Sequence, residues 1–212
     1  MLPIVLQMQD RLCVVIGGGS VGRRKAKTLL EAGACVRIVC PDQRHQDFVA
    51  ADVEWITAAY HPDHLKDAAL VFAAATPNVN RQVVAHAKAR GVLVNSASEP
   101  DTGDFFLPAV VRHGDFVLAI GTGGAAPALA REVRRKLEAE FGEAFGQWVA
   151  LLAELRPVIH AQCSDPERRR KIMERLCEWR WLAHLRQHRI EETHAAMAAE
   201  VRALAASSSD PL

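Results

Sequence analysis

A glycine loop near the N-terminus constrains the fold of this chain more than any other sequence feature. The apolar run ending at Ile16 is followed by Gly17-Gly18-Gly19 and then by Gly22, which gives the spacing Gly17-x-Gly19-x-x-Gly22. Between a strand and a helix, the first glycine permits a tight turn, the second lets the backbone approach a pyrophosphate, and the third lets helix and strand pack closely. The pattern predicts a dinucleotide site at the helix N-terminus. A tight turn without a ligand is the alternative.

Short apolar runs alternate with helical patterns through the first half of the chain, which is typical of βαβ units with a parallel sheet. Strands are expected at Arg11–Ile16, Val36–Cys40, Val53–Thr57, Ala69–Ala74 and Val92–Asn95. Helices are expected at Val21–Ala32 and at Asn78–Arg90, the second ending before Gly91. These elements predict an α/β chain whose residues 1–112 form a Rossmann-type parallel sheet with its helices.

The second half has a different pattern. Two apolar runs, Phe105–Val111 and Phe116–Ile120, flank a polar turn and predict a hairpin. Helices are expected at Ala128–Phe141 and Gln147–Leu155, and a further long helix is expected to begin near Pro166. We therefore predict a hairpin and helix region at 113–146 and a C-terminal helical module at 147–212. A hairpin with no larger sheet to join exposes strand edges, which favours a homodimer with 113–146 as its dimerisation region.

Charge and composition exclude several classes of partner. The formal net charge of the 212 residues is +1, so no global field would attract nucleic acid or an anionic membrane. The five cysteines have no framework spacing, and we interpret them as reduced thiols. The sequence begins without the pattern of a signal peptide, and no apolar run approaches the ~20 residues of a membrane span. We expect a cytoplasmic protein without nucleic-acid or membrane partners.

Three cations, Arg23, Arg24 and Lys25, directly follow the glycine loop. Cations near a helix N-terminus oppose the helix dipole at a cost of about 0.3–1 kcal/mol each, so a carboxylate-rich ligand beside the phosphates is expected. The alternative is a solvated face for at least one of them, Arg23 first. An acidic residue after the second strand would hold an adenosine ribose, and Asp42 lies near that place. This favours NAD over NADP, although Arg44 is close by.

Four motifs in order carry a resemblance to a known family: GGGSVGRRKAKTLLEAG, AAATPNVN, VNSASEP ahead of FFLPAVV, and AIGTGGAAPALAREVRRKLE. From Leu2 to Gln147 the chain resembles the precorrin-2 dehydrogenase family, which includes the dehydrogenase and sirohydrochlorin ferrochelatase part of sirohaem synthase. The resemblance implies NAD-dependent oxidation of precorrin-2 to sirohydrochlorin in tetrapyrrole biosynthesis, by a homodimer. Because precorrin-2 is rich in carboxylates, the resemblance also accounts for the cations after the loop.

The resemblance implies roles for individual positions. Cofactor-binding candidates are Gly17, Gly19, Ser20, Val21, Gly22, Pro41, Asp42 and Thr76. Substrate-binding candidates are Arg24, Lys25, Asn95 and Thr122. The family has a catalytic aspartate where this chain has Ser98, so the catalytic candidates are Ser98 and the nearby Asp101 and Asp104, with Glu99 beside them. One hypothesis is that a displaced carboxylate acts as the base. The favoured one is that hydride transfer needs mainly positioning, with water or a substrate carboxylate taking the proton.

Several alternatives stay open. Ferrochelatase activity could accompany the dehydrogenase, although Ser98 disfavours it, or the chain could be a non-catalytic NAD-binding redox sensor. Thr122 could simply cap a turn before the next helix. His184, His188 and Glu192 have the i, i+4, i+8 spacing of one helical face, but we expect that face to be solvated and predict no metal site. We likewise interpret the basic run 168–171 as a solvated face, with contact to substrate carboxylates as the alternative.

Overall fold

The structure is a computed structural model that describes residues 1–49 and 52–206. The chain forms two compact units, Met1–Leu107 and Pro108–Leu212. The division falls before the hairpin, so the hairpin is grouped with the helices that follow it. The finer division of the second unit into a dimerisation region and a helical module stays a prediction.

The first unit contains a parallel sheet of five strands: β1 (Leu12–Ile16), β2 (Cys35–Cys40), β3 (Val53–Thr57), β4 (Leu70–Ala73) and β5 (Leu93–Ser96). Their order is β3-β2-β1-β4-β5, and Val15 of β1 lies opposite Ile38 of β2 and Phe72 of β4. This is the strand order of a Rossmann fold, which confirms the predicted fold class. The order reverses between β1 and β4, so the loops that follow these two strands flank the switch point where such sheets bind ligands.

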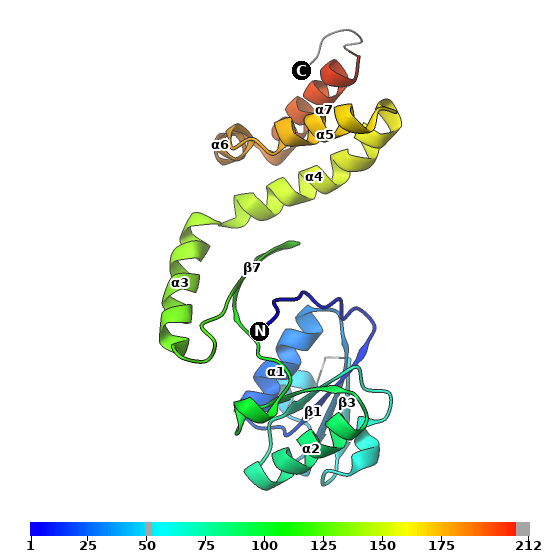
Figure 1. Cartoon of the computed structure of the whole chain (residues 1–212), viewed down its shortest axis with the longest axis vertical. Coiled ribbons are helices and arrows are strands. Elements are labelled where there is room, and N and C mark those ends of the chain that lie inside the picture. The colour runs from blue at the N-terminus through cyan, green and yellow to red at the C-terminus, as the bar shows by residue number, and fades with distance from the viewer. Residues whose placement is uncertain (50–51, 207–212) are drawn as a thin grey trace. The chain divides into compact units, whose positions relative to one another are not determined.

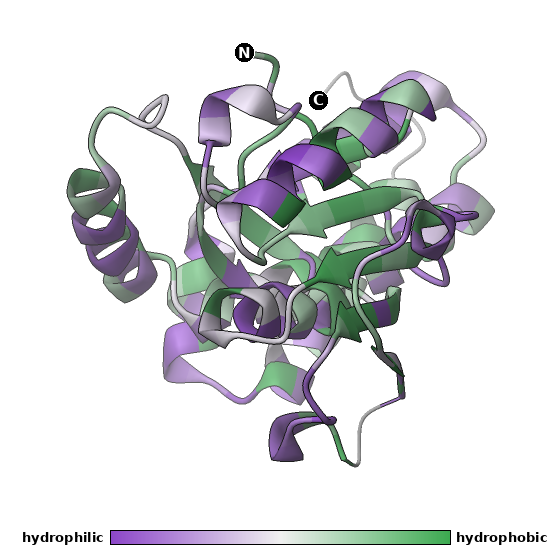
Figure 2. Ribbon diagram, turned by 90° about the horizontal axis from the view of Figure 1, so that it is seen from below, coloured by the Kyte–Doolittle hydropathy of each residue, from purple (hydrophilic) through white to green (hydrophobic). Residues whose placement is uncertain are grey.

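The two helices of this unit cover opposite faces of the sheet, as the alternation along β1 shows. Cys13 and Val15 pack in one buried cluster with α1 (Ser20–Glu31), whereas Val14 and Ile16 pack in another with α2 (Pro77–Ala89) (Figure 1). A sheet that is covered on both faces needs strands that are apolar on both sides. Figure 2 shows this as nearly uniform green strands beside helices that alternate between purple and green. Short 3₁₀ turns lie at Gln46–Phe48, Pro62–Leu65 and Pro100–Thr102.

The second unit begins with an antiparallel hairpin of β6 (Ala109–His113) and β7 (Phe116–Ile120), joined at Gly114 with φ of 59°. The hairpin confirms the predicted one, but its first strand starts at Ala109 rather than Phe105. The reason is that Phe105 belongs to the first unit, where its ring packs edge to face on Phe72 at 5.4 Å. The helices are α3 (Pro127–Glu140), α4 (Glu143–Gln162), α5 (Pro166–Leu176), α6 (Arg180–Gln187) and α7 (Ile190–Ala206).

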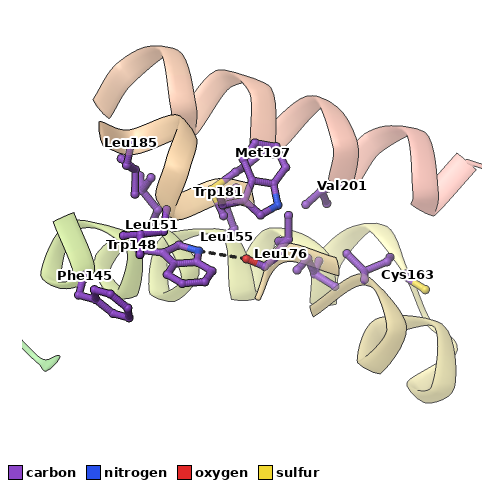
Figure 3. Packing of buried hydrophobic residues seen from close by; sticks show 13 residues of the cluster. Phe145, Trp148, Leu151, Leu155, Cys163, Leu176, Trp181, Leu185, Met197 and Val201 are labelled. Carbon is purple, nitrogen blue, oxygen red and sulfur yellow. Dashed lines mark hydrogen bonds between the residues drawn. The ribbon is translucent and has the colours of Figure 1, made fainter. Parts of the chain in front are cut away.

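The expected long helix from Pro166 is wrong, because three helices occupy that stretch. Two indole groups bond the end of α5: Nε1 of Trp148 donates to the carbonyl oxygen of Leu176 at 3.0 Å (Figure 3), and Nε1 of Trp181 donates to that of Arg175 at 3.1 Å. The last carbonyls of a helix lack intrahelical partners, and these bonds satisfy two of them. Helix α4 is also longer than the expected Gln147–Leu155.

The core of the helical unit is one buried cluster that joins α4, α5, α6 and α7 (Figure 3). Trp148 and Trp181 lie in it. Trp179 is 62% exposed, and its ring contacts those of Phe145 and Trp148. Among the helices in the described part of the chain, none is long and apolar enough to cross a membrane.

Candidate functional site

The glycine loop between β1 and α1 is packed too tightly for side chains at two of its glycines. Gly17 has a φ of 113° and donates its N–H to the carbonyl oxygen of Val39 at 2.9 Å. A Cβ at Gly17 would lie 2.4 Å from the carbonyl oxygen of Ala74, and one at Gly22 would lie 2.0 Å from that of Gly17. The loop is therefore held between the ends of β2 and β4 and directly against α1.

Gly19 differs, because a Cβ there would meet no protein atom within 4 Å. It is the N-cap residue of α1, with extended backbone, and within residues 1–49 and 52–206 no side chain caps this helix end. Ser20 and Val21 open the helix, and its first turn contains no acidic residue. Free N–H groups at a helix N-terminus beside open space fit a pyrophosphate, so the residues present suit the predicted dinucleotide.

The three cations after the loop have three different surroundings. Arg23 donates from Nη1 to the carbonyl oxygen of Gly18 at 3.1 Å, and its Nε lies 3.9 Å from Asp47. Lys27 also pairs with Asp47, at 2.9 Å, and is the largest cause of the lowered pKa of that carboxyl group. Arg23 is thus a bound part of the loop rather than a solvated side chain. Arg24, by contrast, is exposed.

Lys25 is the half-buried cation of the three. Its Nζ lies 5.3 Å from the centroid of the Phe72 ring, within range of a cation–π contact. In the described part of the chain, Lys25 forms no ion pair. Desolvation, followed by repulsion from Arg24, lowers the pKa of its amine. A cation that is partly buried without a carboxylate partner is poised to receive one from a ligand.

The end of β2 brings Asp42 to the side of the loop, where an adenosine ribose is expected. The thiol of Cys40 donates to Oδ2 of Asp42 at 3.5 Å, and a Cβ on Gly18 would lie 2.8 Å from the Cys40 sulfur. Trp55 donates from Nε1 to the carbonyl oxygen of Asp42 at 3.1 Å, and its ring edge lies near Gly18 as well. Asp42 and the preceding Pro41 are exposed. The sequence analysis missed Trp55, whose signal was an aromatic residue on the strand beside β2.

On the other side of the switch point, Asn80 organises the loops after β4 and β5. Its Oδ1 accepts from the N–H of Ala75 at 2.8 Å, and its Nδ2 donates to the carbonyl oxygen of Ala75 at 3.2 Å and to Oγ of Ser98 at 3.0 Å. The side chain is 1% exposed. Thr76, the exposed N-cap residue of α2, lies between Ala75 and Asn80 in the sequence. Asn80 lies in the motif AAATPNVN, but its buried contacts could not be predicted from the sequence.

The catalytic candidates do not gather in one place. Ser98 follows β5 at the carboxyl edge of the sheet, bonded to Asn80. Asp101 is exposed in the 3₁₀ turn Pro100–Thr102. Asp104 accepts from the backbone N–H of Val94 at 3.0 Å and lies 3.9 Å from Lys88, in the last turn of α2 and at the opposite helix end from Thr76. Of the three candidates, Asp104 therefore lies away from the carboxyl edge.

Two substrate candidates are already engaged, and they lie in different units. Asn95 is buried and donates from Nδ2 to the carbonyl oxygen of Phe105 at 2.8 Å. Thr122 belongs to the second unit, where its Oγ1 accepts from the N–H of Ala126 at 3.3 Å and its carbonyl oxygen accepts from Ala125 at 3.1 Å. Thr122 thus caps the turn just before α3, which was the alternative to a role in substrate binding.

The series His184, His188 and Glu192 does not share a helical face, contrary to the expectation from its spacing. His184 lies in α6 and Glu192 in α7, because α6 ends at Gln187 and α7 begins at Ile190. His188, between them, lies 3.4 Å from Glu192. Within the described residues, no group of three or more His, Cys, Asp or Glu side chains could hold a metal ion.

Comparison with protein families gives a match to the family described as "Putative NAD(P)-binding", over residues 4–109. Among curated proteins, the chain is similar to siroheme synthase of Nitrosospira multiformis, with 35% identity over 185 residues that cover 84% of this chain and 39% of the relative. Siroheme synthase of Pseudomonas entomophila is 37% identical over 177 residues, which cover 82% of this chain and 38% of the relative. The chain thus spans well under half the length of these relatives.

Among solved structures, the chain is similar to a protein named SirC, precorrin-2 dehydrogenase, with a TM-score of 0.72 and 23% sequence identity. The match covers 94% of this chain and all of the other. At that identity, the likeness establishes a shared fold, which includes the hairpin and the C-terminal helices as well as the parallel sheet.

Proposed function

Because the chain belongs to the family described as "Putative NAD(P)-binding", we propose that it is an NAD-dependent dehydrogenase that oxidises precorrin-2 to sirohydrochlorin. The observation that carries the proposal is that open space at Gly19, the N-cap of α1, is followed on that helix by Lys25, a half-buried cation with no ion pair among the described residues. The names of the siroheme synthase relatives and the fold shared with a precorrin-2 dehydrogenase support the substrate class.

The chain would bind the cofactor with the loop that links β1 to α1. Gly17 and Gly22 allow the backbone to lie close, and the N–H groups at Gly19, Ser20 and Val21 would donate to the pyrophosphate. The exposed carboxylate of Asp42, with Pro41 before it, would accept from the adenosine ribose and favour NAD over NADP. Thr76 would line the same edge after β4. When bound, NAD supplies the hydride acceptor.

Arg24 and Lys25 would bind carboxylates of the tetrapyrrole. Arg24 is exposed, and a guanidinium can hold a carboxylate with two parallel hydrogen bonds. The amine of Lys25 is partly buried without a counter-charge, and a carboxylate of the ligand would form an ion pair with it. Asn95 would contribute by fixing the chain at Phe105, since its amide is already bonded there. Thr122 stays a candidate for substrate contact in the second unit.

Ser98 would position rather than take a proton. Its hydroxyl oxygen already accepts from Asn80, and a neutral alcohol without a base beside it is a poor proton acceptor. Loss of hydride from one carbon leaves a cation, and the accompanying proton, released from a neighbouring atom of the conjugated ring system, would therefore go to water or to a substrate carboxylate. Glu99 is paired with Arg81 at 2.7 Å, so Asp101, exposed in the turn after Ser98, is the remaining carboxylate candidate. Because no carboxylate replaces Ser98, we do not extend the proposal to iron insertion.

The subunit arrangement is proposed from the hairpin. Among the residues that the structure describes, β6 and β7 form a sheet of two strands, so each strand has one edge without a partner strand. Exposed strand edges pair readily with a second chain. Leu129 of α3, which packs near this hairpin, is 55% exposed. We expect a homodimer formed through the hairpin and α3.

The test is an anaerobic assay of the purified chain with fresh precorrin-2 and NAD, following NADH absorbance and the spectrum of sirohydrochlorin. Wild type should turn over, Gly19→Ala should lose turnover because its Cβ takes the place of the pyrophosphate, and Arg202→Gln on α7 should match wild type. A wild-type protein that binds NAD but produces no sirohydrochlorin would refute the dehydrogenase and leave the redox-sensor hypothesis.

A further inference from the structure

A hollow of about 450 Å³ lies on the surface of the helical unit between α4 and α5. Its volume is in the range of small-molecule sites. The lining combines basic and apolar side chains: Arg156, Ile159, His160, Pro166, Arg169, Arg170 and Met173. None of these residues has a part in the proposed dehydrogenase site.

Helical spacing places these side chains around the hollow. Arg156 and His160 are four residues apart on α4, and Arg169 and Met173 are four residues apart on α5, so each pair shares a helix face. Ile159, which is 1% exposed, belongs to the buried core and contributes an apolar floor. Figure 3 shows Cys163, at the end of α4 where the chain turns toward α5, packed in that core. The hollow is therefore built on a rigid base.

The three arginines that line the hollow differ in whether a carboxylate pairs with them. Arg170 pairs with Glu167 at 3.0 Å and with Glu174. Arg169 instead donates from Nη1 to Nδ1 of His160, 2.9 Å away. Arg156 is exposed and, in the part of the chain that the structure describes, forms no hydrogen bond or ion pair. Arg156 and Arg169 thus line the hollow without a carboxylate partner among the described residues.

The contact between Arg169 and His160 adds a hydrogen-bond donor to this set. A guanidinium has only donors, so Nδ1 of His160 must be the acceptor, and the proton of the neutral ring then lies on Nε2. The side chains that line the hollow supply donors and positive charge, and Glu167 and Glu174, the carboxylates that pair with Arg170, are not among them. The missing component is an acceptor that carries negative charge.

We propose that this hollow binds an organic polycarboxylate, with Arg156 and Arg169 holding carboxylate groups and Ile159 and Met173 contacting the apolar body of the ligand. Guanidinium groups hold carboxylates with two parallel hydrogen bonds and are weakly hydrated, which suits them to a partly apolar site. The ligand could come from two sources: the tetrapyrrole of the proposed reaction, held at a second place on the chain, or a smaller polycarboxylate metabolite. The site itself does not depend on the dehydrogenase proposal.

The test measures binding of two probes to the full chain: uroporphyrin, a flat apolar ring with carboxylate side chains, followed by fluorescence, and citrate, which has carboxylates without an apolar body, followed by calorimetry. The variant is Arg156→Gln with Arg169→Gln, and the control is Arg202→Gln, an exposed arginine on α7. Each lost charge-assisted contact is expected to weaken binding ~10-fold or more. Thermal unfolding of each variant reports that the helical unit is folded, and its affinity for NAD reports on the first unit.

A loss of uroporphyrin affinity in the double variant alone, with NAD affinity unchanged, supports the site and assigns it to the tetrapyrrole. The same loss for citrate and not for uroporphyrin supports the site and assigns it to a small polycarboxylate. Equal affinities of wild type, the double variant and Arg202→Gln for both probes would overturn the proposal. None of these results depends on whether the wild type oxidises precorrin-2, so the two proposals can fail separately.

Discussion

Arg23 holds the glycine loop from the helix side: its Nη1 donates to the carbonyl oxygen of Gly18 at 3.1 Å, while its Nε faces Asp47 at 3.9 Å. Asp47 lies after β2 and also pairs with Lys27 of α1. The segment after β2, the helix and the loop are therefore linked through one guanidinium. This contact fixes the carbonyl of Gly18 on one side of the loop, next to the open space at Gly19.

We predict that Arg23→Met lowers NAD affinity by ~3- to 10-fold, because a hydrogen bond that positions the loop contributes ~0.5–1.5 kcal/mol. Lys27→Met removes a cation from the same carboxylate but leaves the bond to Gly18, so it should change NAD affinity little. Titration of intrinsic fluorescence with NAD measures both. Equal losses in the two variants would show that charge near Asp47 matters and the bond to Gly18 does not.

Substitutions at Gly19, the N-cap of α1, and at Gly22 within α1 should have different effects on NAD binding and on stability. A Cβ at Gly19 meets no protein atom, and the backbone there is extended, so Gly19→Ala should keep the unfolding midpoint of wild type. Its methyl group would occupy the place of the pyrophosphate, and we expect NAD affinity to fall at least ~10-fold. Gly22→Ala should instead lower the unfolding midpoint, since its Cβ would lie 2.0 Å from the carbonyl oxygen of Gly17.

Thermal unfolding and NAD titration of both alanine variants test this prediction together. The contrast is the informative result, because both substitutions are chemically identical. If Gly19→Ala retained wild-type NAD affinity, the pyrophosphate could not lie against the N-terminus of α1, and the cofactor part of the proposed function would be wrong.

The parallel sheet could be predicted from the sequence because its signals are local. The spacing of Gly17, Gly19 and Gly22 after an apolar run, and the alternation of strands with helical patterns, depend only on neighbouring residues. Each expected strand of the sheet therefore appears within about one residue of its place, and α1 begins one residue early because Gly19 serves as its cap.

The features that sequence reasoning missed depend on contacts between distant segments. The break after α5 relies on the indole of Trp148, which lies 28 residues before the carbonyl of Leu176 that it satisfies. Asn80 joins Ala75 to Ser98 only because β4 and β5 are neighbours in the sheet. No local pattern encodes such pairs. The positions of the site's loops could therefore be predicted from the sequence, but the hydrogen bonds that hold them could not.

Asn80 should matter more than Ser98. Ser98→Ala removes a hydroxyl that accepts one hydrogen bond, and we expect turnover to stay within ~3-fold of wild type because positioning of the substrate carries the rate. Asn80→Ala leaves the N–H and the carbonyl of Ala75 without their partner, which should lower the free energy of unfolding by ~1–3 kcal/mol and weaken NAD binding.

Urea unfolding and steady-state kinetics of the two variants measure these effects. Asn80→Asp is a useful comparison, because it keeps the acceptor for the N–H of Ala75 but loses the donor to the carbonyl oxygen of Ala75 and to Ser98. A loss of turnover in Ser98→Ala far greater than in Asn80→Asp would mean that the hydroxyl itself takes part in the reaction.

The charge of Lys25 should lower the free energy of unfolding while it favours ligand binding. Desolvation, followed by repulsion from Arg24, lowers the pKa of its amine below 10.5, so the folded chain releases that proton at a lower pH than the unfolded chain does. Between the two pKa values the unfolded state binds more protons, and stability therefore rises with pH. At neutral pH both states are protonated, and the cost of burying the charge is present in full. The contact with Phe72 offsets only part of this cost.

We therefore expect Lys25→Met to raise the free energy of unfolding at neutral pH, and this gain to shrink as the pH approaches 10.5. The same variant should bind a carboxylate-rich tetrapyrrole more weakly, since it lacks the cation that would form an ion pair with a ligand carboxylate. Urea unfolding across the pH range, with Arg90→Met as a control for loss of an exposed cation, measures the first effect. A Lys25→Met protein less stable than wild type at neutral pH would show that the amine already has an anionic partner in the folded chain, and its role as a free receptor for substrate would be untenable.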